Sequence, residues 1–116
     1  MQHPVVWFEV TGTDPAPLRS FYGELFGWSI APAEQSNGYS EVDTKAEGKG
    51  IPGGIGSAKG RPWVTFYVGT IDLAASLAKA KKLGGTTVLE PTDVGPGTRI
   101  AMFQDPEGHT IGLIAR

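Results

Sequence analysis

The stretch that decides the fold is PVVWFEV at residues 4–10, because the same frame returns as PWVTFYV at residues 62–68. Pro, Val, Phe and Val recur at alternate positions of the two copies. The positions between them differ, so that Trp7 and Glu9 correspond to Thr65 and Tyr67. Successive side chains of a β-strand point to opposite faces of the sheet. The pattern therefore predicts two related strands, each with one face common to both copies and one face particular to its own copy.

The repeat extends along the whole chain with an offset of half its 116 residues. At this offset Asp72 corresponds to Asp14 at a predicted helix start, and Gly112 corresponds to Gly54 in a predicted strand. Half of the chain would bury too little apolar surface to be stable alone, so the halves should share one core. We predict one domain over residues 1–116, made of a first module (1–58) and a second module (59–116).

Each module is predicted to have the order β-α-β-β-β, which is an α+β fold. Helices should begin at Asp14-Pro15 and Asp72 and end at Gly27 and Gly84, by the usual preferences for caps. The other predicted strands are residues 28–34, 39–44 and 51–57 in the first module, and 86–90, 98–104 and 109–115 in the second. Apolar residues at three- and four-residue spacing should form the buried stripe of each helix. They are Leu18, Phe21, Tyr22, Leu25 and Phe26 in the first helix, and Leu73, Leu77, Ala80 and Leu83 in the second.

Composition excludes several classes of protein. A net charge of -2 and a pI near 5.6 give no basic surface for nucleic acid. The absence of cysteine excludes disulfides, thiolate metal sites and a cysteine nucleophile. Because the sequence shows neither a long apolar run nor a leader-like start, we expect no membrane span, no signal peptide and a cytoplasmic location.

The tandem β-α-β-β-β order is combined with FY at 21–22, FGW at 26–28, DPEG at 105–108 and IGL at 111–113. Together these features resemble the vicinal oxygen chelate superfamily, which includes glyoxalase I, bleomycin-resistance proteins and extradiol dioxygenases. The resemblance implies a curved, cup-shaped sheet of eight strands with the helices on its outer face and a small-molecule ligand inside. It also implies a homodimer, as for other short members. In the metal-dependent members, one residue near the start of each module's first strand and one in each fourth strand bind the metal.

Those four family positions fall on Trp7, Gly54, Thr65 and Gly112 in this sequence. An indole offers no free lone pair, glycine has no side chain, and a single threonine hydroxyl is a poor ligand. A bound metal normally needs three or four N, O or S donors. We therefore predict no metal site and no other cofactor.

The candidate ligand-binding residues lie on the strand face that is particular to each copy and on the last two strands. They are Trp7, Glu9, Thr65, Tyr67, Ile100, Met102, Thr110 and Gly112. Trp7 either stacks on an aromatic ligand or plugs the cup. Glu9 either meets a cation or is hydrogen-bonded to a neighbour such as Tyr67 or an arginine. The glycines either widen the cup or simply permit strand curvature and close backbone approach.

These residues favour a protein that binds a small aromatic or cationic molecule over an enzyme. The alternative is a lyase, isomerase or dioxygenase-like enzyme, with Glu9 and Tyr67 as weak candidates for a base and an acid, or with an unrecognised metal site. A third possibility is a structural module whose cup is filled by its own side chains. Outside the site, His109 is expected to cap the turn at Asp105.

Overall fold

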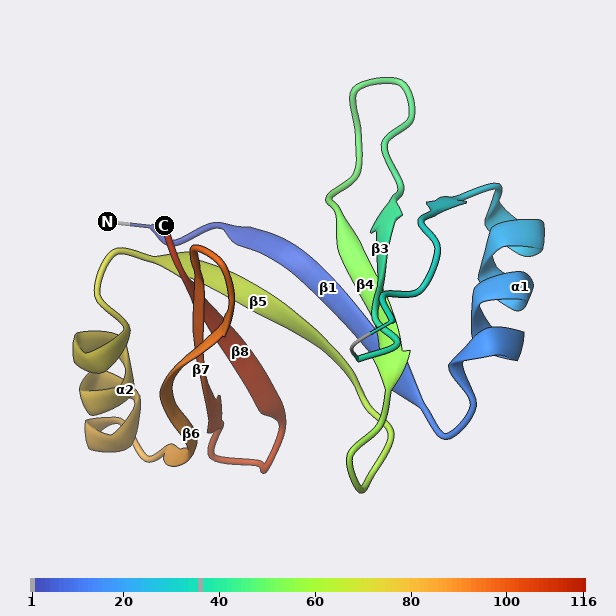
Figure 1. Ribbon diagram of the computed structural model, residues 1–116. Coiled ribbons are helices and arrows are strands. Elements are labelled where there is room, and N and C mark those ends of the chain that lie inside the picture. The colour runs from blue at the N-terminus through green and yellow to red at the C-terminus, as the bar shows by residue number, and fades with distance from the viewer. Residues whose placement is uncertain (1, 36) are drawn as a thin grey trace. The chain divides into compact units, whose positions relative to one another are not determined.

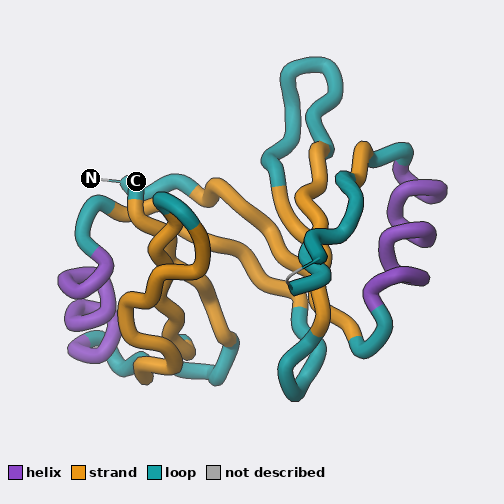
Figure 2. Tube along the Cα trace, in the orientation of Figure 1, coloured by secondary structure: helices purple, strands orange, loops and turns teal. Residues whose placement is uncertain are grey.

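The chain forms two compact units in the computed structural model, which describes residues 2–35 and 37–116. The first unit is Trp7–Val64, and the second joins residues 65–116 to the residues before Trp7. Each unit carries one helix (Figure 2). Neither helix is long and apolar enough to cross a membrane within the described ranges.

The first unit contains β1 (Val5–Gly12, from Trp7 onward), α1 (Pro15–Phe26), β2 (Ser29–Ile30), β3 (Ser40–Asp43) and β4 (Gly53–Ser57) (Figure 1). Its strands lie in the order β2-β3-β4-β1. β1 and β4 are parallel, and the other neighbours are antiparallel.

The second unit contains β5 (Val64–Thr70), α2 (Leu73–Lys82), β6 (Thr86–Gly95), β7 (Thr98–Gln104) and β8 (Thr110–Ala115). Its strands lie in the equivalent order β5-β8-β7-β6, again with one parallel pair, β5 and β8. Glu9 lies beside Gly54 in the first unit, and Tyr67 lies beside Gly112 in the second. These pairs correspond in the sequence repeat, so the α+β class and the tandem β-α-β-β-β order are confirmed. The predicted cup shape depends on how the two units are arranged relative to each other, so it stays a prediction.

α1 covers the common face of the first unit's strands, as predicted. Val10, Val42 and Ile55 are buried there, and Phe8, Leu18 and Tyr22 pack against them. The helix begins at Pro15 and ends before Gly27, whose φ of 70° is the left-handed conformation that glycine adopts without steric cost. Asp14 stands at the N-cap position, but its side chain makes no capping hydrogen bond there, so that part of the prediction is wrong.

The predicted apolar stripe of α1 is only half correct. Leu18 and Tyr22 reach the core, whereas Phe21, Leu25 and Phe26 remain 57–58% exposed. Residues four apart lie one above the other on a helix, so Leu18 and Tyr22 follow the line that faces the sheet. The five residues of the predicted stripe span a wider arc of the helix surface than the contact between α1 and the sheet can bury.

α2 packs on the second unit through Leu73 and Leu77, which join Ala101 and Leu113 in a second core. Its stripe ends earlier than predicted. Leu83 is 70% exposed because the helix stops at Lys82 and Leu83 is already the C-cap residue. Asp72 caps the start of α2 as predicted, since its carboxylate accepts a hydrogen bond from the Ala75 amide at 3.0 Å.

Two predicted strand boundaries are wrong. The second strand is Ser29–Ile30 rather than residues 28–34, and β6 continues to Gly95, five residues beyond its predicted end at Glu90. Pro91 lies where the register of β6 against β7 shifts between Leu89 and Thr92. A bulge is one of the few places where a strand tolerates proline, and this bulge allows β6 to extend.

Asp105 and His109 close the turn before β8, as predicted. The Asp105 carboxylate accepts hydrogen bonds from the backbone amides of His109 and Glu107, and it meets His109 Nδ1 at 2.9 Å. The His109 amide, first, and then its ring and the Glu107 amide lower the pKa of Asp105 below 3.8, against an opposing effect of desolvation.

We expect Leu77→Ala to lower the free energy of unfolding by about 2–5 kcal/mol, because it opens a cavity beside α2. Leu83→Ala, at the C-cap of the same helix, is the matched control and should change it by less than about 0.5 kcal/mol, as is usual for an exposed site. Urea unfolding followed by circular dichroism measures both. Equal losses in the two variants would contradict the observed end of α2.

We expect Asp105→Asn to make stability less dependent on pH in acid. Since the folded pKa is depressed, the ionised carboxylate stabilises the fold above its unfolded pKa, and this contribution is lost as the pH falls through the folded value. The difference in melting temperature between the wild type and Asp105→Asn should therefore shrink from pH 5 to pH 2.5. A difference that stays constant over this range would show that Asp105 contributes through something other than its charge.

Candidate ligand-binding site

The site in the first unit is built around Glu9 of β1, whose side chain is only 8% exposed. Its Oε2 accepts a hydrogen bond from Trp63 Nε1–H at 2.9 Å, and its Oε1 accepts one from the Tyr39 hydroxyl at 3.1 Å. Both donors are neutral groups. These bonds replace hydrogen bonds to water that the carboxylate loses on burial.

Tyr39 connects Glu9 to Trp7. Its hydroxyl accepts a hydrogen bond from Trp7 Nε1–H at 2.9 Å while it donates to Glu9. Its ring lies over β4, where it occupies the space that a Cβ atom at Gly54 would need, and it also crowds the Cβ position of Gly56. Glycine at these two positions is therefore what admits the tyrosine.

The directions of these three hydrogen bonds follow from the donors. An indole Nε1–H can only donate, so Trp7 must donate to Tyr39 and Trp63 must donate to Glu9. The Tyr39 hydroxyl already accepts from Trp7, which leaves its proton for Glu9. The hydrogen bonds reach the Glu9 carboxylate from two sides, from Trp7 through Tyr39 and directly from Trp63, and we call these four side chains the Glu9 cluster (Trp7, Glu9, Tyr39 and Trp63).

The four positions that correspond to the family's metal ligands do not fit a metal ion. The Trp7 nitrogen is a hydrogen-bond donor to Tyr39, and the Thr65 hydroxyl bonds the Thr110 carbonyl oxygen at 2.6 Å. The spaces beside Gly54 and Gly112 are filled by tyrosine rings. Among the described residues, no group of three or more His, Cys, Asp or Glu side chains is placed to hold an ion.

The second unit carries the other predicted site residues on the corresponding strands. Thr65, Tyr67 and Met102 are buried, and Tyr67 places its ring over Gly112 as Tyr39 does over Gly54. Ile100 and Thr110 are half-buried. Gly112 therefore does not leave an empty space in this unit, and the same holds for Gly54 in the first. The role of these residues in binding stays a prediction.

Sequence reasoning missed two members of the cluster, Tyr39 and Trp63. Trp63 lies one residue before β5, and its backbone amide donates to the Thr11 hydroxyl at 3.1 Å, which brings its ring beside β1. Tyr39 lies one residue before β3. A signal for Tyr39 was present: two glycines at alternate positions of one strand leave room for a large ring from a neighbouring strand.

We expect Glu9→Gln to lower the free energy of unfolding by about 1–3 kcal/mol, because glutamine offers one acceptor oxygen to two donors. It should also shift the indole N–H resonances of Trp63 and Trp7 in a ¹H–¹⁵N spectrum. The Trp28 indole, in the core beneath α1, is the internal control and should not move. Trp63 and Trp7 resonances that stay in place would contradict the hydrogen-bonded cluster.

Comparison with known proteins agrees with this architecture. The family model described as a glyoxalase-like domain matches residues 7–114. A glyoxylase-like domain-containing protein of Didymella fabae is 30% identical, with 93% of this chain and 90% of that protein covered. The anthracycline biosynthesis protein DnrV of Streptomyces peucetius is 28% identical over 88% of this chain. This chain covers only 43% of its length, as it does for the corresponding protein DauV of Streptomyces sp. (strain C5).

Solved structures show the same fold at lower identity. A glyoxalase/bleomycin resistance protein/dioxygenase superfamily member from Vibrio splendidus 12B01 has a TM-score of 0.68 and 16% identity, with 99% of this chain and 100% of that chain covered. Methylmalonyl-CoA epimerase from Mycobacterium tuberculosis has a TM-score of 0.67 and 16% identity, with 96% and 86% covered. The resemblance to the vicinal oxygen chelate superfamily is confirmed, and the chain belongs to its glyoxalase-like domain family.

Proposed function

We propose that the protein binds a small aromatic or cationic molecule at the Glu9 cluster, and that it does so without a metal ion at the family's ligand positions. The observation that carries this proposal is a buried carboxylate that accepts hydrogen bonds from one indole and one phenol, with a second indole bonded to that phenol. Trp7, Tyr39 and Trp63 are each only half-buried, so their rings still present surface. Aromatic surface beside a polar group is typical of sites for small molecules.

Two relatives support the aromatic part of the proposal. They are named as anthracycline biosynthesis proteins, and anthracyclines are polycyclic aromatic compounds. Indole rings bind flat aromatic systems by stacking, which is worth about 0.5–1.5 kcal/mol beyond the area buried. The proposal carries over only the ligand class, since this chain spans less than half of those proteins.

The packing around the two glycines at the family's metal positions supports the proposal that binding needs no metal ion. Restoring a side-chain ligand at Gly54 would force Tyr39 out of its place, because the new Cβ would overlap the ring. The same conflict exists between Gly112 and Tyr67 in the second unit. The chain is therefore built to hold tyrosines where metal-dependent members of the family project a ligand.

We expect a planar aromatic ligand to quench tryptophan fluorescence at saturation, and Trp7→Ala to weaken its binding roughly fivefold or more through the lost stacking. Calorimetric titration with a panel of two- to four-ring aromatic compounds, anthracyclines included, measures the affinity. Phe21→Ala is the matched control, because it removes an exposed aromatic ring from α1. The proposal fails if no member of the panel binds, or if Trp7→Ala and Phe21→Ala weaken binding equally.

Metal analysis of the same protein tests the proposal that binding needs no metal ion. After purification without chelators and dialysis, we expect less than one divalent ion per ten chains, and added Zn²⁺, Mn²⁺ or Ni²⁺ should leave the affinity for the aromatic ligand unchanged. A stoichiometric ion that is needed for binding would contradict the metal-free proposal.

A further inference from the structure

A hollow of about 370 Å³ lies in the first unit between the end of α1 and the hairpin loop that joins β3 to β4. It is lined by residues 26–29 and by residues 43–46, and we call it the hairpin hollow. None of these residues belongs to the Glu9 cluster. A volume of this size is typical of sites that bind small molecules.

Two aromatic rings supply the apolar part of the hairpin hollow. Phe26 is the last residue of α1 and remains 57% exposed, and the half-buried Trp28 follows the turn at Gly27. The ring centroids of Phe26 and Trp28 lie 5.1 Å apart, with the planes at 37°. Tyr22 stacks on Trp28 with the planes only 15° apart, which fixes the indole from the side of α1. A ligand ring can therefore contact aromatic surface that is already ordered.

Two opposite charges line the same hollow, on Asp43 and Lys45. Both side chains are exposed, and within the described part of the chain neither forms an ion pair. The Asp43 carboxylate accepts a hydrogen bond from the Lys45 backbone amide at 2.8 Å, which fixes its position. Each of the two charges can therefore meet an opposite charge on a ligand.

The hairpin loop holds the backbone of Lys45 in place. Ala46 and Lys49 exchange two backbone hydrogen bonds, at 3.0 and 2.9 Å. The Thr44 hydroxyl donates to the Ile51 carbonyl oxygen at 2.8 Å. Because hydrogen bonds tie the loop on both sides of Lys45, only the lysine side chain has to become ordered when a ligand binds, which keeps the entropic cost small.

The end of α1 favours a positive group at the hollow. The last carbonyl groups of a helix have no partner within the helix and carry partial negative charge. The Gly27 amide bonds the Gly23 carbonyl oxygen, and among the described residues of the last turn of α1 none is basic. Phe26 and Gly27 bring this end of the helix to the hollow. An ammonium group therefore meets negative potential there and at Asp43.

We infer that the hairpin hollow binds a free aromatic amino acid in its zwitterionic form. The ring contacts Phe26 and Trp28, the ammonium group lies at Asp43 and the end of α1, and the carboxylate lies at Lys45. A molecule with a single charge satisfies only one of the two charged side chains and is repelled by the other. The site is separate from the Glu9 cluster, so the inference does not rest on the proposed function.

The test compares three probes that share one ring: L-phenylalanine, a zwitterion at pH 7, phenethylamine, a cation, and 3-phenylpropionate, an anion. Titration of the ¹⁵N-labelled full chain at low salt should shift the Trp28 indole N–H and the amides of Lys45 and Ala46. The Trp7 and Trp63 indoles report the Glu9 cluster separately. L-Phenylalanine should bind about threefold more tightly than either singly charged probe, because exposed charge pairs are weak. Added salt should remove most of this difference.

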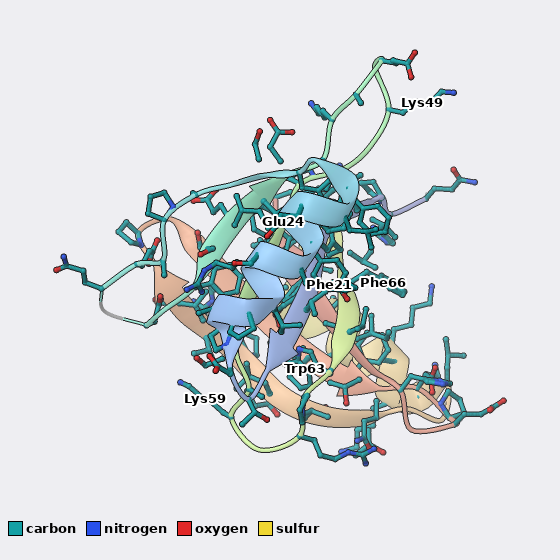
Figure 3. The ribbon with its side chains drawn as sticks, turned by 90° about the vertical axis from the view of Figure 1, so that its right-hand side faces the viewer. Phe21, Glu24, Lys49, Lys59, Trp63 and Phe66 are labelled. Atoms are coloured by element: carbon teal, nitrogen blue, oxygen red, sulfur yellow. The ribbon has the colours of Figure 1, made fainter. Side chains whose placement is uncertain are left out.

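Variants locate the three parts of the site. Lys45→Gln should lower the affinity for L-phenylalanine to about that for phenethylamine. Asp43→Asn keeps an acceptor for the Lys45 amide and should lower it to about that for 3-phenylpropionate. Phe26→Ala should weaken all three probes alike. Lys49→Gln, near the tip of the hairpin loop, is the control for charge, and Phe21→Ala, on the exposed side of α1, is the control for the ring (Figure 3).

The outcomes separate this inference from the proposed function. If the probes shift Trp7 and Trp63 but not Trp28, the ligand lies at the Glu9 cluster, and the inference is wrong while the proposed function stands. Equal affinities for the three probes, or equal losses in Lys45→Gln and Lys49→Gln, would overturn the assignment of the two charges. If no probe shifts any of these resonances, the hairpin hollow does not bind aromatic amino acids, whatever the larger aromatic compounds do at Trp7.

Discussion

A carboxylate withdrawn from water must find donors, and the arrangement of the first unit follows from meeting that requirement at Glu9. Trp63 and Tyr39 approach from the loop before β5 and the segment before β3, so that residues far apart in the sequence meet at one side chain. Tyr39 can take part only because β4 has glycine at two alternate positions. The hydrogen bonds to Glu9 therefore depend on the glycines of the neighbouring strand β4.

The two modules share a scaffold and differ in what they place on it. Glu9 beside Gly54 and Tyr67 beside Gly112 occupy equivalent registers, and in both modules a tyrosine ring lies over the fourth-strand glycine. The tyrosines come from different places: Tyr39 precedes β3, whereas Tyr67 lies within β5, directly beside its glycine. The common feature is a glycine packed under an aromatic ring, and in the first module the hydroxyl of that ring donates to the Glu9 carboxylate.

This chain illustrates how a fold can persist while the chemistry of its site changes. Membership of the glyoxalase-like family is shown by the match over residues 7–114, and several solved structures with 11–18% identity to the chain have the same fold. The residues at the four family metal positions lack the side-chain donors that a metal ion needs, because they present indole, hydroxyl and backbone groups. Function must therefore be argued from the site itself.

The sequence by itself determined the repeat, the order of elements, the face of β1 that packs under α1, the caps at Asp72 and Gly27, and the unsuitability of Trp7, Gly54, Thr65 and Gly112 as metal ligands. These features depend on local periodicity, on backbone preferences and on the chemistry of single side chains, all of which can be read along the chain. Only the tertiary structure decided that Trp63 and Tyr39 hold Glu9, that residues 43–46 meet the end of α1 at one hollow, and that Phe21 and Leu25 stay exposed on α1. Those outcomes depend on strand register and on the width of a helix contact, which bring together residues that no local pattern relates.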